Sequence, residues 1–201
     1  MNRFAERLLE QPWVYKTWQG PFADQKFAPV LAHNDLRQAR RVLDVGCGTG
    51  TNAKYFAETK YLGIDINPEY IDDARRNCQG EFVTADVRTY SPPGDLLFDF
   101  VLVNSFLHHL NSTDVEGVLR QLRKVLAVDG HAHILELVLP QDLSIPRLLA
   151  RCDRGRFPRP ESEWEMIFSQ VFEPVVFETY PWTGAGLSLW SMVYFKGRAR
   201  R

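Results

Sequence analysis

The segment RVLDVGCGTG, from Arg41 to Gly50, constrains the fold of this chain more than any other part of its sequence. Its apolar start predicts a short buried strand, and its three glycines predict that the strand ends abruptly in a tight loop. Glycine lets a backbone adopt unusual dihedral angles and lets a ligand approach it closely. We therefore expect a nucleotide-like ligand to lie against this loop.

Strand-like and helix-like segments alternate along the chain. Further strands are predicted at YLGIDI, EFVTADV, FDFVLVNSF and, after a turn at Asp129-Gly130, HAHILELVL. Helices are predicted at TNAKYFAETK, after an Asn67 N-cap, and after a capping box formed by Thr113 and Glu116. EPVVFETYPW and LSLWSMVYF predict a terminal antiparallel hairpin. The alternation predicts a doubly wound α/β fold, in which helices cover both faces of a parallel sheet.

Length, charge and cysteine usage narrow the class of protein. The 201 residues suffice for one domain with a sizeable core, and the formal net charge of -1 provides no general attraction to nucleic acid or anionic membrane. No run approaches the ~20 apolar residues that a membrane-spanning helix needs. The charged N-terminus lacks a signal core, and three scattered cysteines indicate reduced thiols. We therefore expect a cytoplasmic protein.

Acidic residues near the ends of the first three predicted strands indicate the ligand. Asp44 precedes the first glycine by two residues, where an anion repels a pyrophosphate and favours a cation. Asp65 lies where an acid binds ribose hydroxyls, and Asp86 lies where an acid can accept a hydrogen bond from the adenine amine. S-adenosylmethionine has adenosine, a positive charge and no phosphates, and it fits all three. The third glycine of a dinucleotide fingerprint would fall on Thr51, which argues against NAD and a dehydrogenase.

Four motifs now support a family resemblance. LDVGCGTG, GIDINPEYI, FVTADV and FDFVLVNSFLHHL resemble, in order and spacing, the motifs of the class I (Rossmann-like) S-adenosylmethionine-dependent methyltransferases. The resemblance runs from about Arg41 to Leu139 and implies a mostly parallel seven-stranded sheet with an antiparallel last strand. It also implies S-adenosylmethionine as cofactor and S-adenosylhomocysteine as product. The expected cofactor-binding residues are Asp44, Gly46, Cys47, Gly48, Asp65, Ile66, Tyr70, Asp86, Val87, Asn104 and Ser105.

Two of these positions have a competing structural interpretation. The side chain of Cys47 is expected to fill the loop rather than to act as a nucleophile, and Tyr70 is expected to pack in the core rather than against adenine. The chain divides into a helical, aromatic lid at 1–38, a cofactor-binding core at 39–139, and an acceptor-side segment with the terminal strand pair at 140–201. The lid is expected because similar methyltransferases cover the cofactor with the segment before the first strand.

The acceptor side offers one candidate for acid–base chemistry. His108 and His109 follow the fourth predicted strand, and Glu136 lies in the fifth. A histidine held by a carboxylate makes a usable general base, so His108 is the predicted base, His109 its alternative and Glu136 the orienting acid. The competing interpretation is that the histidines cap the helix or pack beneath the cofactor. His131 and His133 share a strand face but lack a third ligand, so no metal site is predicted.

Two segments could contact the acceptor. Five aromatic residues before the first strand could line an apolar pocket or only pack a helix onto the sheet: Trp13, Tyr15, Trp18, Phe22 and Phe27. Five arginines follow the fifth strand and could bind an anionic acceptor or form a solvated surface: Arg147, Arg151, Arg154, Arg156 and Arg159.

These observations predict methyl transfer to a small-molecule or lipid-like metabolite, at oxygen. NSFL stands where nucleobase and glutamine methyltransferases resemble one another in an Asn/Asp-Pro-Pro-Tyr stretch, which argues against those acceptors. An RNA or protein methyltransferase remains the alternative, although no basic domain is evident for docking nucleic acid. A non-catalytic partner subunit that binds the cofactor is the second alternative. The acceptor and the oligomeric state are not predicted.

Overall fold

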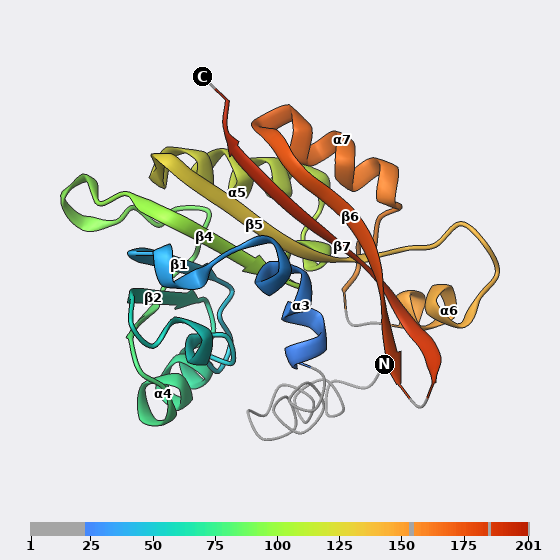
Figure 1. Ribbon diagram of the computed structural model, residues 1–201, viewed down its shortest axis with the longest axis horizontal. Coiled ribbons are helices and arrows are strands. Elements are labelled where there is room, and N and C mark those ends of the chain that lie inside the picture. The colour runs from blue at the N-terminus through green and yellow to red at the C-terminus, as the bar shows by residue number, and fades with distance from the viewer. Residues whose placement is uncertain (1–22, 153–154, 185, 201) are drawn as a thin grey trace.

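The computed structural model describes residues 23–152, 155–184 and 186–200 (Figure 1). Their strands are β1 Arg41–Val45, β2 Lys60–Asp65, β3 Glu81–Thr84, β4 Phe98–Asn104, β5 Leu126–Val138, β6 Phe172–Gly184 and β7 Leu187–Ala199. Their α-helices are α3 Ala23–His33, α4 Pro68–Asn77, α5 Ser112–Val125, α6 Ile145–Cys152 and α7 Glu161–Val171. Short 3-10 helices are η2 Leu36–Gln38, η3 Ala53–Phe56, η4 Pro93–Asp95 and η5 Leu107–His109.

The strands form one seven-stranded sheet in the order β3-β2-β1-β4-β5-β7-β6. The first five strands pair in parallel, and β7 pairs antiparallel with both β5 and β6. The predicted fold, including the antiparallel last strand, is therefore confirmed. The strand order reverses between β1 and β4, which makes their carboxyl ends the topological switch point where ligands of such sheets bind.

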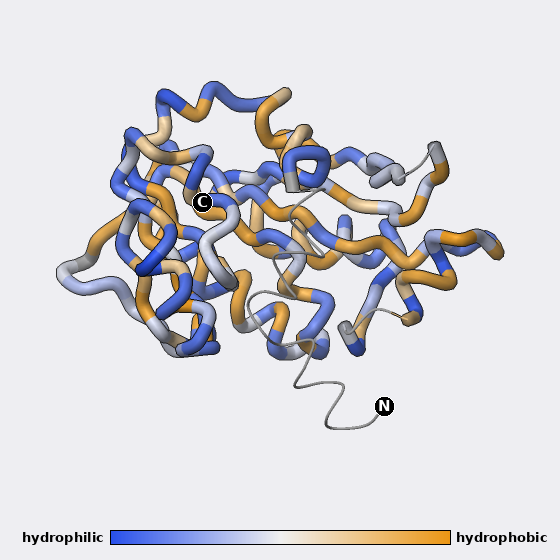
Figure 2. The backbone as a smooth tube through the Cα atoms, turned by 90° about the horizontal axis from the view of Figure 1, so that it is seen from below, coloured by the Kyte–Doolittle hydropathy of each residue, from blue (hydrophilic) through white to orange (hydrophobic). Residues whose placement is uncertain are grey.

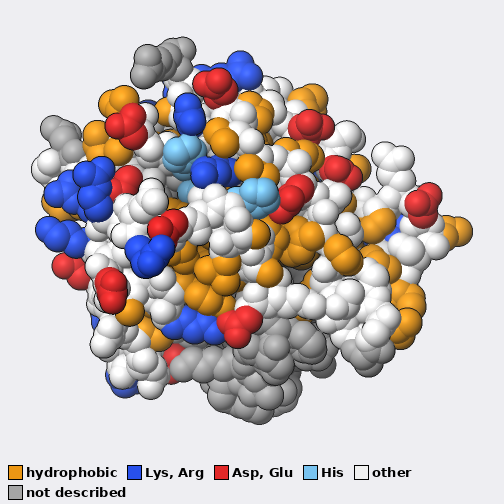
Figure 3. Space-filling view, in the orientation of Figure 1, with side chains coloured by type: hydrophobic (Ala, Val, Ile, Leu, Met, Phe, Trp, Pro, Cys, Tyr) orange, Lys and Arg blue, Asp and Glu red, His pale blue; other side chains and the backbone are white. Residues whose placement is uncertain are grey.

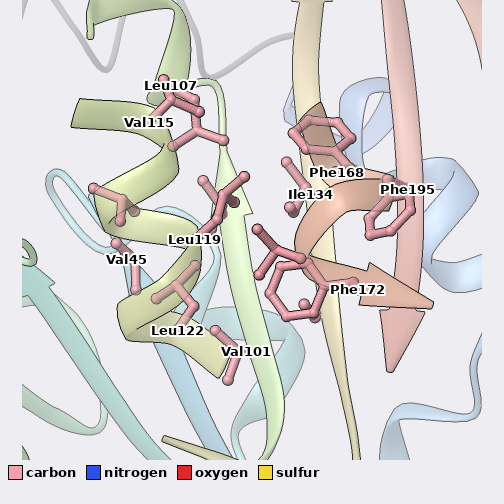
Figure 4. Packing of buried hydrophobic residues seen from close by; sticks show 14 of the residues in the cluster. Val45, Val101, Leu107, Val115, Leu119, Leu122, Ile134, Phe168, Phe172 and Phe195 are labelled. Carbon is pink, nitrogen blue, oxygen red and sulfur yellow. The ribbon is translucent and has the colours of Figure 1, made fainter. Parts of the chain in front are cut away.

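Helices cover both faces of the sheet, as Figure 1 shows. Successive side chains of β1 point to opposite faces and so pack against different helices. Leu43 and Val45 belong to the buried cluster that α5 and α7 cover. Figure 4 shows Val45 beside the apolar stripe of α5, which includes Leu119 and Leu122. Val42 lies on the opposite face, in the cluster covered by α3 and α4. In Figure 2 hydrophobic stretches run through the interior, as expected for strands buried on both faces.

Three local predictions were wrong. The segment TNAKYFAETK forms only η3, because the chain turns back at once into β2, with Thr59 donating to the Phe56 carbonyl at 3.0 Å. The cap of α5 is Asn111, whose side chain accepts from the Asp114 amide at 3.0 Å. Thr113 therefore lies inside the helix, because the better capping residue precedes it.

The fifth strand also begins earlier than predicted. β5 starts at Leu126 and runs through Asp129 and Gly130, with a register shift opposite Phe98 and Phe100 of β4. A Cβ atom on Gly130 would lie 2.7 Å from the Phe98 carbonyl oxygen. Glycine therefore permits the close approach of the two backbones at this irregularity, instead of forming a turn before the strand.

Other predicted elements are confirmed. The Asn67 side chain accepts from the Glu69 amide at 2.9 Å and caps α4. β6 and β7 form the terminal antiparallel hairpin. In the part of the chain that the structure describes, no helix combines the length and apolar character needed to cross a membrane.

The segment between β5 and α7 leaves and rejoins the sheet at neighbouring points. Val138, the last residue of β5, forms a parallel bridge with Arg159, and the Leu139 amide donates to the Arg159 carbonyl at 2.8 Å. Helix α6 lies within this segment and packs against β7, with Ala150 buried beside Met192 and Trp182. The segment therefore lies beyond the carboxyl end of β5.

Candidate active site

The glycine loop after β1 follows a backbone path that side chains disfavour. Gly46, Gly48 and Gly50 have φ angles of 68°, 55° and 76°, in the left-handed region. The amides of Gly46 and Cys47 donate to the Ile64 carbonyl at 2.9 and 3.1 Å, which fixes the loop against β2. The loop therefore presents backbone, rather than side chains, at the carboxyl edge of the sheet.

Asp65 closes β2 beside this loop. Its Oδ2 accepts from the Gly48 amide at 3.0 Å, and its Oδ1 accepts from the Asn67 amide at 2.8 Å. Burial raises the pKa of this carboxyl group above its ordinary value, although the backbone hydrogen bonds oppose the shift. The next residue, Ile66, has an apolar side chain that is 63% exposed. A carboxylate and an open apolar surface thus lie side by side.

Asp44 is fully buried behind the glycine loop. Its Oδ2 accepts from the Tyr61 hydroxyl at 2.5 Å and from the Asn52 side-chain amide at 3.0 Å. Its Oδ1 has no hydrogen-bond partner. Burial raises the pKa of Asp44 to about 6, and the hydrogen bonds from Tyr61 and Asn52 limit the rise. A buried acceptor without a partner is the kind of group that a bound donor or cation satisfies.

Sequence reasoning missed the residues that surround Asp44. Asn52, itself buried, accepts from the Asn104 side-chain amide at 3.2 Å and so joins the ends of β1 and β4. Tyr61 lies opposite Val42 in the sheet register. Val42 precedes Asp44 by two residues, so the side chains of Tyr61 and Asp44 lie on the same face of the sheet. The period-two alternation of adjacent strands could have revealed the Tyr61 contact, but no sequence signal indicates Asn52.

The remaining cofactor candidates differ in what they offer. Asp86 is held by Arg88, whose Nη2 lies 2.6 Å from Oδ2, so an adenine amine would share this carboxylate with a guanidinium. Val87 is 7% exposed, and Tyr70 is half-buried on α4. Cys47 is buried in the loop, and burial raises the pKa of its thiol far above the ordinary value, which opposes a nucleophilic role.

His108 and Glu136 meet at the carboxyl ends of β4 and β5. His108 Nδ1 lies 2.7 Å from Glu136 Oε2, and both side chains are buried. Burial raises the pKa of Glu136, but the charge and hydrogen bond of His108 and the amides of Leu107 and Phe106 outweigh it, so the pKa is lowered. His109 is exposed, with its ring centroid 4.3 Å from that of His108. The structure thus brings the predicted pair together, and its catalytic role stays a prediction.

The acceptor-side segment covers His108. A Cβ atom on Gly155 would lie 2.0 Å from His108 Cδ2 and 3.0 Å from Nε2, so only a glycine fits over the ring. The Phe157 amide donates to the His108 carbonyl at 3.0 Å. His108 is only 4% exposed as a result. A substrate would reach its Nε2 only if this cover moved.

The arginine cluster is not uniform. Arg159 is buried, donates to the carbonyls of Phe157 and Leu110 at 3.0 and 2.9 Å, and lies over the Trp164 ring at 4.8 Å. Its prediction as an anion-binding residue was therefore wrong, because folding already uses its donors. Arg147 donates to the carbonyls of Pro140 and Gln141.

The other arginines and the aromatic residues complete the acceptor side. Arg151 and Arg156 are exposed, and Arg154 lies outside the described residues. Of the predicted lid aromatics, Phe27 is fully buried on α3 and stacks on Tyr55 with 4.1 Å between centroids. This packing fixes α3 to the sheet and does not line a pocket. The other four aromatics, Trp13, Tyr15, Trp18 and Phe22, lie outside the described residues.

The second histidine pair has structural contacts. His133 stacks on Phe100 with centroids 3.7 Å apart, and its Nδ1 lies 3.0 Å from the Tyr194 hydroxyl. Burial lowers the pKa of His133 well below its ordinary value. His131 lies 3.2 Å from Arg198 between side-chain nitrogens. Within the described ranges, no three His, Cys, Asp or Glu side chains are grouped so as to hold a metal ion.

This edge of the sheet fits S-adenosylmethionine. The glycine loop follows a left-handed backbone path, Asp65 offers carboxylate oxygens beside the exposed Ile66, and Asp44 retains an unsatisfied buried oxygen. The Asp65 carboxylate matches a ribose, the exposed Ile66 matches an adenine face, and Asp44 matches a positive charge. Which of them contacts the cofactor remains a prediction.

Comparisons with known proteins agree with this geometry. A family model described as a methyltransferase domain matches residues 42–130. The chain is 33% identical over 142 residues to a trans-aconitate 2-methyltransferase of Methylobacterium nodulans, covering 65% of this chain and 52% of that protein. It is 36% identical over 117 residues to a fatty-acid O-methyltransferase of Mycolicibacterium smegmatis, covering 53% of this chain and 42% of that protein. The chain thus spans about half the length of the curated relatives it matches.

Solved structures share the fold. The PH0226 protein of Pyrococcus horikoshii aligns with a TM-score of 0.71 at 19% identity, covering 93% of this chain and 92% of that chain. The N-methyltransferase NodS of Bradyrhizobium japonicum aligns with a TM-score of 0.68 at 19% identity, covering 90% and 98%. The sequence matches and this shared fold thus support the resemblance to the class I (Rossmann-like) S-adenosylmethionine-dependent methyltransferases.

Proposed function

We propose that the protein transfers a methyl group from S-adenosylmethionine to an oxygen of a small-molecule or lipid-like acceptor, and that this oxygen belongs to a carboxylate. One observation carries the proposal. The carboxyl ends of β1, β2, β4 and β5 bring the glycine loop and Asp65 to the same edge as the turn that holds His108 and Glu136. A cofactor site and an acceptor site would therefore adjoin at the switch point of the sheet.

The chain's own residues would hold the cofactor at this edge. The carboxylate of Asp65 would accept hydrogen bonds from ribose hydroxyls, and the Gly46–Gly50 backbone would admit the ligand without steric conflict. Ile66 would cover one face of adenine. The bound cofactor supplies an electrophilic methyl group on a sulfonium. The negative charge of buried Asp44 would favour the positively charged cofactor over its neutral product.

A carboxylate acceptor fits the acceptor side of the structure. A carboxylate is already an anion at neutral pH, so its methylation needs positioning and no proton acceptor. The structure keeps His108 covered by Gly155, while Arg151 and Arg156 are exposed on the adjoining segment and could attract an anion. The names of the two curated relatives support this class, since both refer to the methylation of organic acids.

A hydroxyl acceptor is the second candidate, and the His108–Glu136 contact favours it. Glu136 lies against Nδ1 of His108 at 2.7 Å, which leaves Nε2 as the nitrogen that could take a proton. The segment bearing Gly155 would have to move away for an acceptor to reach Nε2. His108 would then act as the general base that the sequence predicts.

A labelling experiment separates these chemistries. The protein is incubated with methyl-labelled S-adenosylmethionine and panels of aliphatic mono- and tricarboxylic acids, alcohols, phenols, RNA and protein. We expect label in a carboxylic acid, and we expect mild alkali to release it as methanol because esters hydrolyse. An alkali-stable methyl ether would instead establish the hydroxyl candidate. Cofactor binding without transfer to any acceptor in the panels or in cell extract would favour a non-catalytic subunit.

A further inference from the structure

The turn after β4 is held by a carboxylate from the neighbouring strand. Glu136 is fully buried, and its Oε1 accepts from the amides of Phe106 and Leu107 at 2.8 and 2.5 Å. Its other oxygen contacts His108. That oxygen also accepts from the Leu137 amide at 3.3 Å, so two of the four contacts of this carboxylate go to the backbone of the turn and only one goes to the histidine. Glu136 organises the path of the chain as well as the imidazole.

The same turn contains an unfavourable backbone conformation. Ser105 has a φ angle of 56° and is the only non-glycine residue with a positive φ among residues 23–152, 155–184 and 186–200. Such a conformation persists where surrounding contacts over-determine it. The Ser105 amide donates to the Leu135 carbonyl at 2.8 Å, and buried Leu107 lies near Val115 of α5 in Figure 4. Contacts on both sides of Phe106 thus fix where its side chain points.

The side chain of Phe106 points toward the glycine loop. A Cβ atom on Gly46 would lie 3.0 Å from Cγ of the Phe106 ring and 3.2 Å from both Cβ and Cδ2. The ring therefore packs directly on the backbone of the first glycine. Gly46 is held on its other side by the Ile64 carbonyl at 2.9 Å. The glycine is thus enclosed between β2 and the Phe106 ring.

We infer that Phe106 is a positioning residue for the glycine loop and that Glu136 sets the position of the Phe106 ring. The carboxylate in β5 fixes the turn, the turn fixes the ring, and the ring supports Gly46 at the end of β1. Glu136 would then affect cofactor binding independently of any action on His108. The inference rests on the proposed placement of S-adenosylmethionine against the glycine loop, and it does not depend on the acceptor.

Binding of S-adenosylhomocysteine, measured by calorimetry without an acceptor, tests the role of the ring. Phe106→Ala should weaken binding by at least ~10-fold, about the effect of one well-placed contact, and Phe106→Leu should restore part of the affinity. Phe177→Ala is the matched control, because Phe177 is also a partly buried ring against the same hydrophobic cluster but lies on β6, at the far edge of the sheet. The control should bind with wild-type affinity.

Variants of Glu136 test the second half of the inference. Glu136→Gln keeps an oxygen that accepts from the two amides, so its affinity should stay within ~3-fold of wild type, while Glu136→Ala should lose at least ~10-fold. Adding Ser105→Gly to Glu136→Ala should recover affinity, because glycine adopts a positive φ without the carboxylate. In the protein without cofactor, hydrogen exchange at the Gly46 and Cys47 amides should accelerate in Glu136→Ala and in Phe106→Ala.

The outcomes separate this inference from the proposed function. Wild-type affinity in both Phe106→Ala and Glu136→Ala, with unchanged exchange at the glycine loop, would overturn the inference alone. Equal losses in Glu136→Gln and Glu136→Ala would overturn the role of the two amides. If the wild-type protein failed to bind S-adenosylhomocysteine, both the inference and the proposed function would be wrong. Circular dichroism of each variant identifies loss of folding, and the Phe106→Leu variant then decides the role of the ring.

Discussion

The carboxyl edge of the sheet around Gly46–Gly50 and Asp65, here called the cofactor edge, and the acceptor-side segment between β5 and α7 differ in how their residues are held. At the cofactor edge, short backbone hydrogen bonds fix the glycine loop, and the carboxylates of Asp44 and Asp65 are held by neighbouring groups. The acceptor-side segment instead exposes large apolar side chains: Leu143 is 95%, Leu148 63% and Ile145 50% exposed. In Figure 3 hydrophobic side chains appear at the end of the molecule where Figure 1 places α6.

This difference matches the proposed division of the protein into a region that binds the cofactor and a region that binds the acceptor. A region that binds a ligand shared by a whole family can be fixed by backbone geometry, because the ligand does not change. A region that contacts an individual acceptor depends on particular side chains in a connecting segment, as functional loops on a rigid scaffold generally do. The predictions below test whether the two regions can be separated experimentally.

The largest effect is expected from Gly48→Val. Gly48 has a φ of 55°, which a β-branched residue adopts only with strain, and its amide bonds to Asp65. Affinity for S-adenosylmethionine should fall by at least ~100-fold, beyond detection in a standard titration. Wild-type-like binding by a folded variant would show that the cofactor does not lie against this loop.

The buried Asp44 should give the protein a pH-dependent stability. Burial raises its pKa from 3.8 to about 6, so its contribution to stability is fully present below pH 3.8 and is lost as pH rises through about 6. Between these two pH values the free energy of unfolding of the wild type should fall by about 3 kcal/mol relative to that of Asp44→Asn, since one pKa unit corresponds to 1.36 kcal/mol. Urea unfolding of both proteins between pH 4 and 7 measures the difference. Parallel pH profiles would mean that Asp44 is not the buried acid that titrates.

Asp65→Ala should weaken cofactor binding while the fold survives. If the carboxylate takes two ribose hydroxyls, the variant loses two charge-assisted hydrogen bonds of about 1.5–3 kcal/mol each at best. We expect at least a ~10-fold rise in the dissociation constant by calorimetry. An unchanged constant would mean that the ribose lies elsewhere.

His108→Ala distinguishes the two acceptor chemistries. With a carboxylate acceptor, turnover should fall less than ~10-fold, because no proton is removed and the contact of His108 with Glu136 is then structural. A loss of ~10²–10⁴ with intact cofactor binding would instead identify a general base and a hydroxyl acceptor. The wild-type rate would then also fall in acid, as the imidazole becomes protonated.

The smallest effect is expected on the acceptor side. Removing exposed Arg151 and Arg156 together should raise the KM for an anionic acceptor by ~3–10-fold and leave cofactor affinity unchanged, because exposed charges are screened by water and salt. The KM for a neutral acceptor should not change. An equal effect on cofactor binding would show that the two regions are not separable.

The cofactor edge could largely be predicted from sequence, and its details show why. Strand-terminal acids and glycines lie within single motifs, so the positions of Asp44, Gly46 and Asp65 near strand ends could be predicted from local spacing, while their contact with the cofactor stays a prediction. Asn52 and Phe106 were missed because their partners come from other strands, and no local pattern reports such contacts. The helix predicted at TNAKYFAETK is absent for a related reason. The segment must turn back to pair β2 with β1, and this tertiary contact outweighs its local helix propensity. Arg159 was misassigned because burial cannot be read from a run of charges.

The bridge between Val138 and Arg159 has a consequence for the conformational entropy of the chain. Because the chain departs from the sheet and rejoins it at two bonded residues, the stretch between them is a closed loop inserted at a fixed junction. The entropy of closing such a loop rises only slowly with its length, so the length of this stretch adds little to the cost of joining its two ends. The junction therefore keeps the carboxyl end of β5 and the start of α7 together while the chain between them takes its own path.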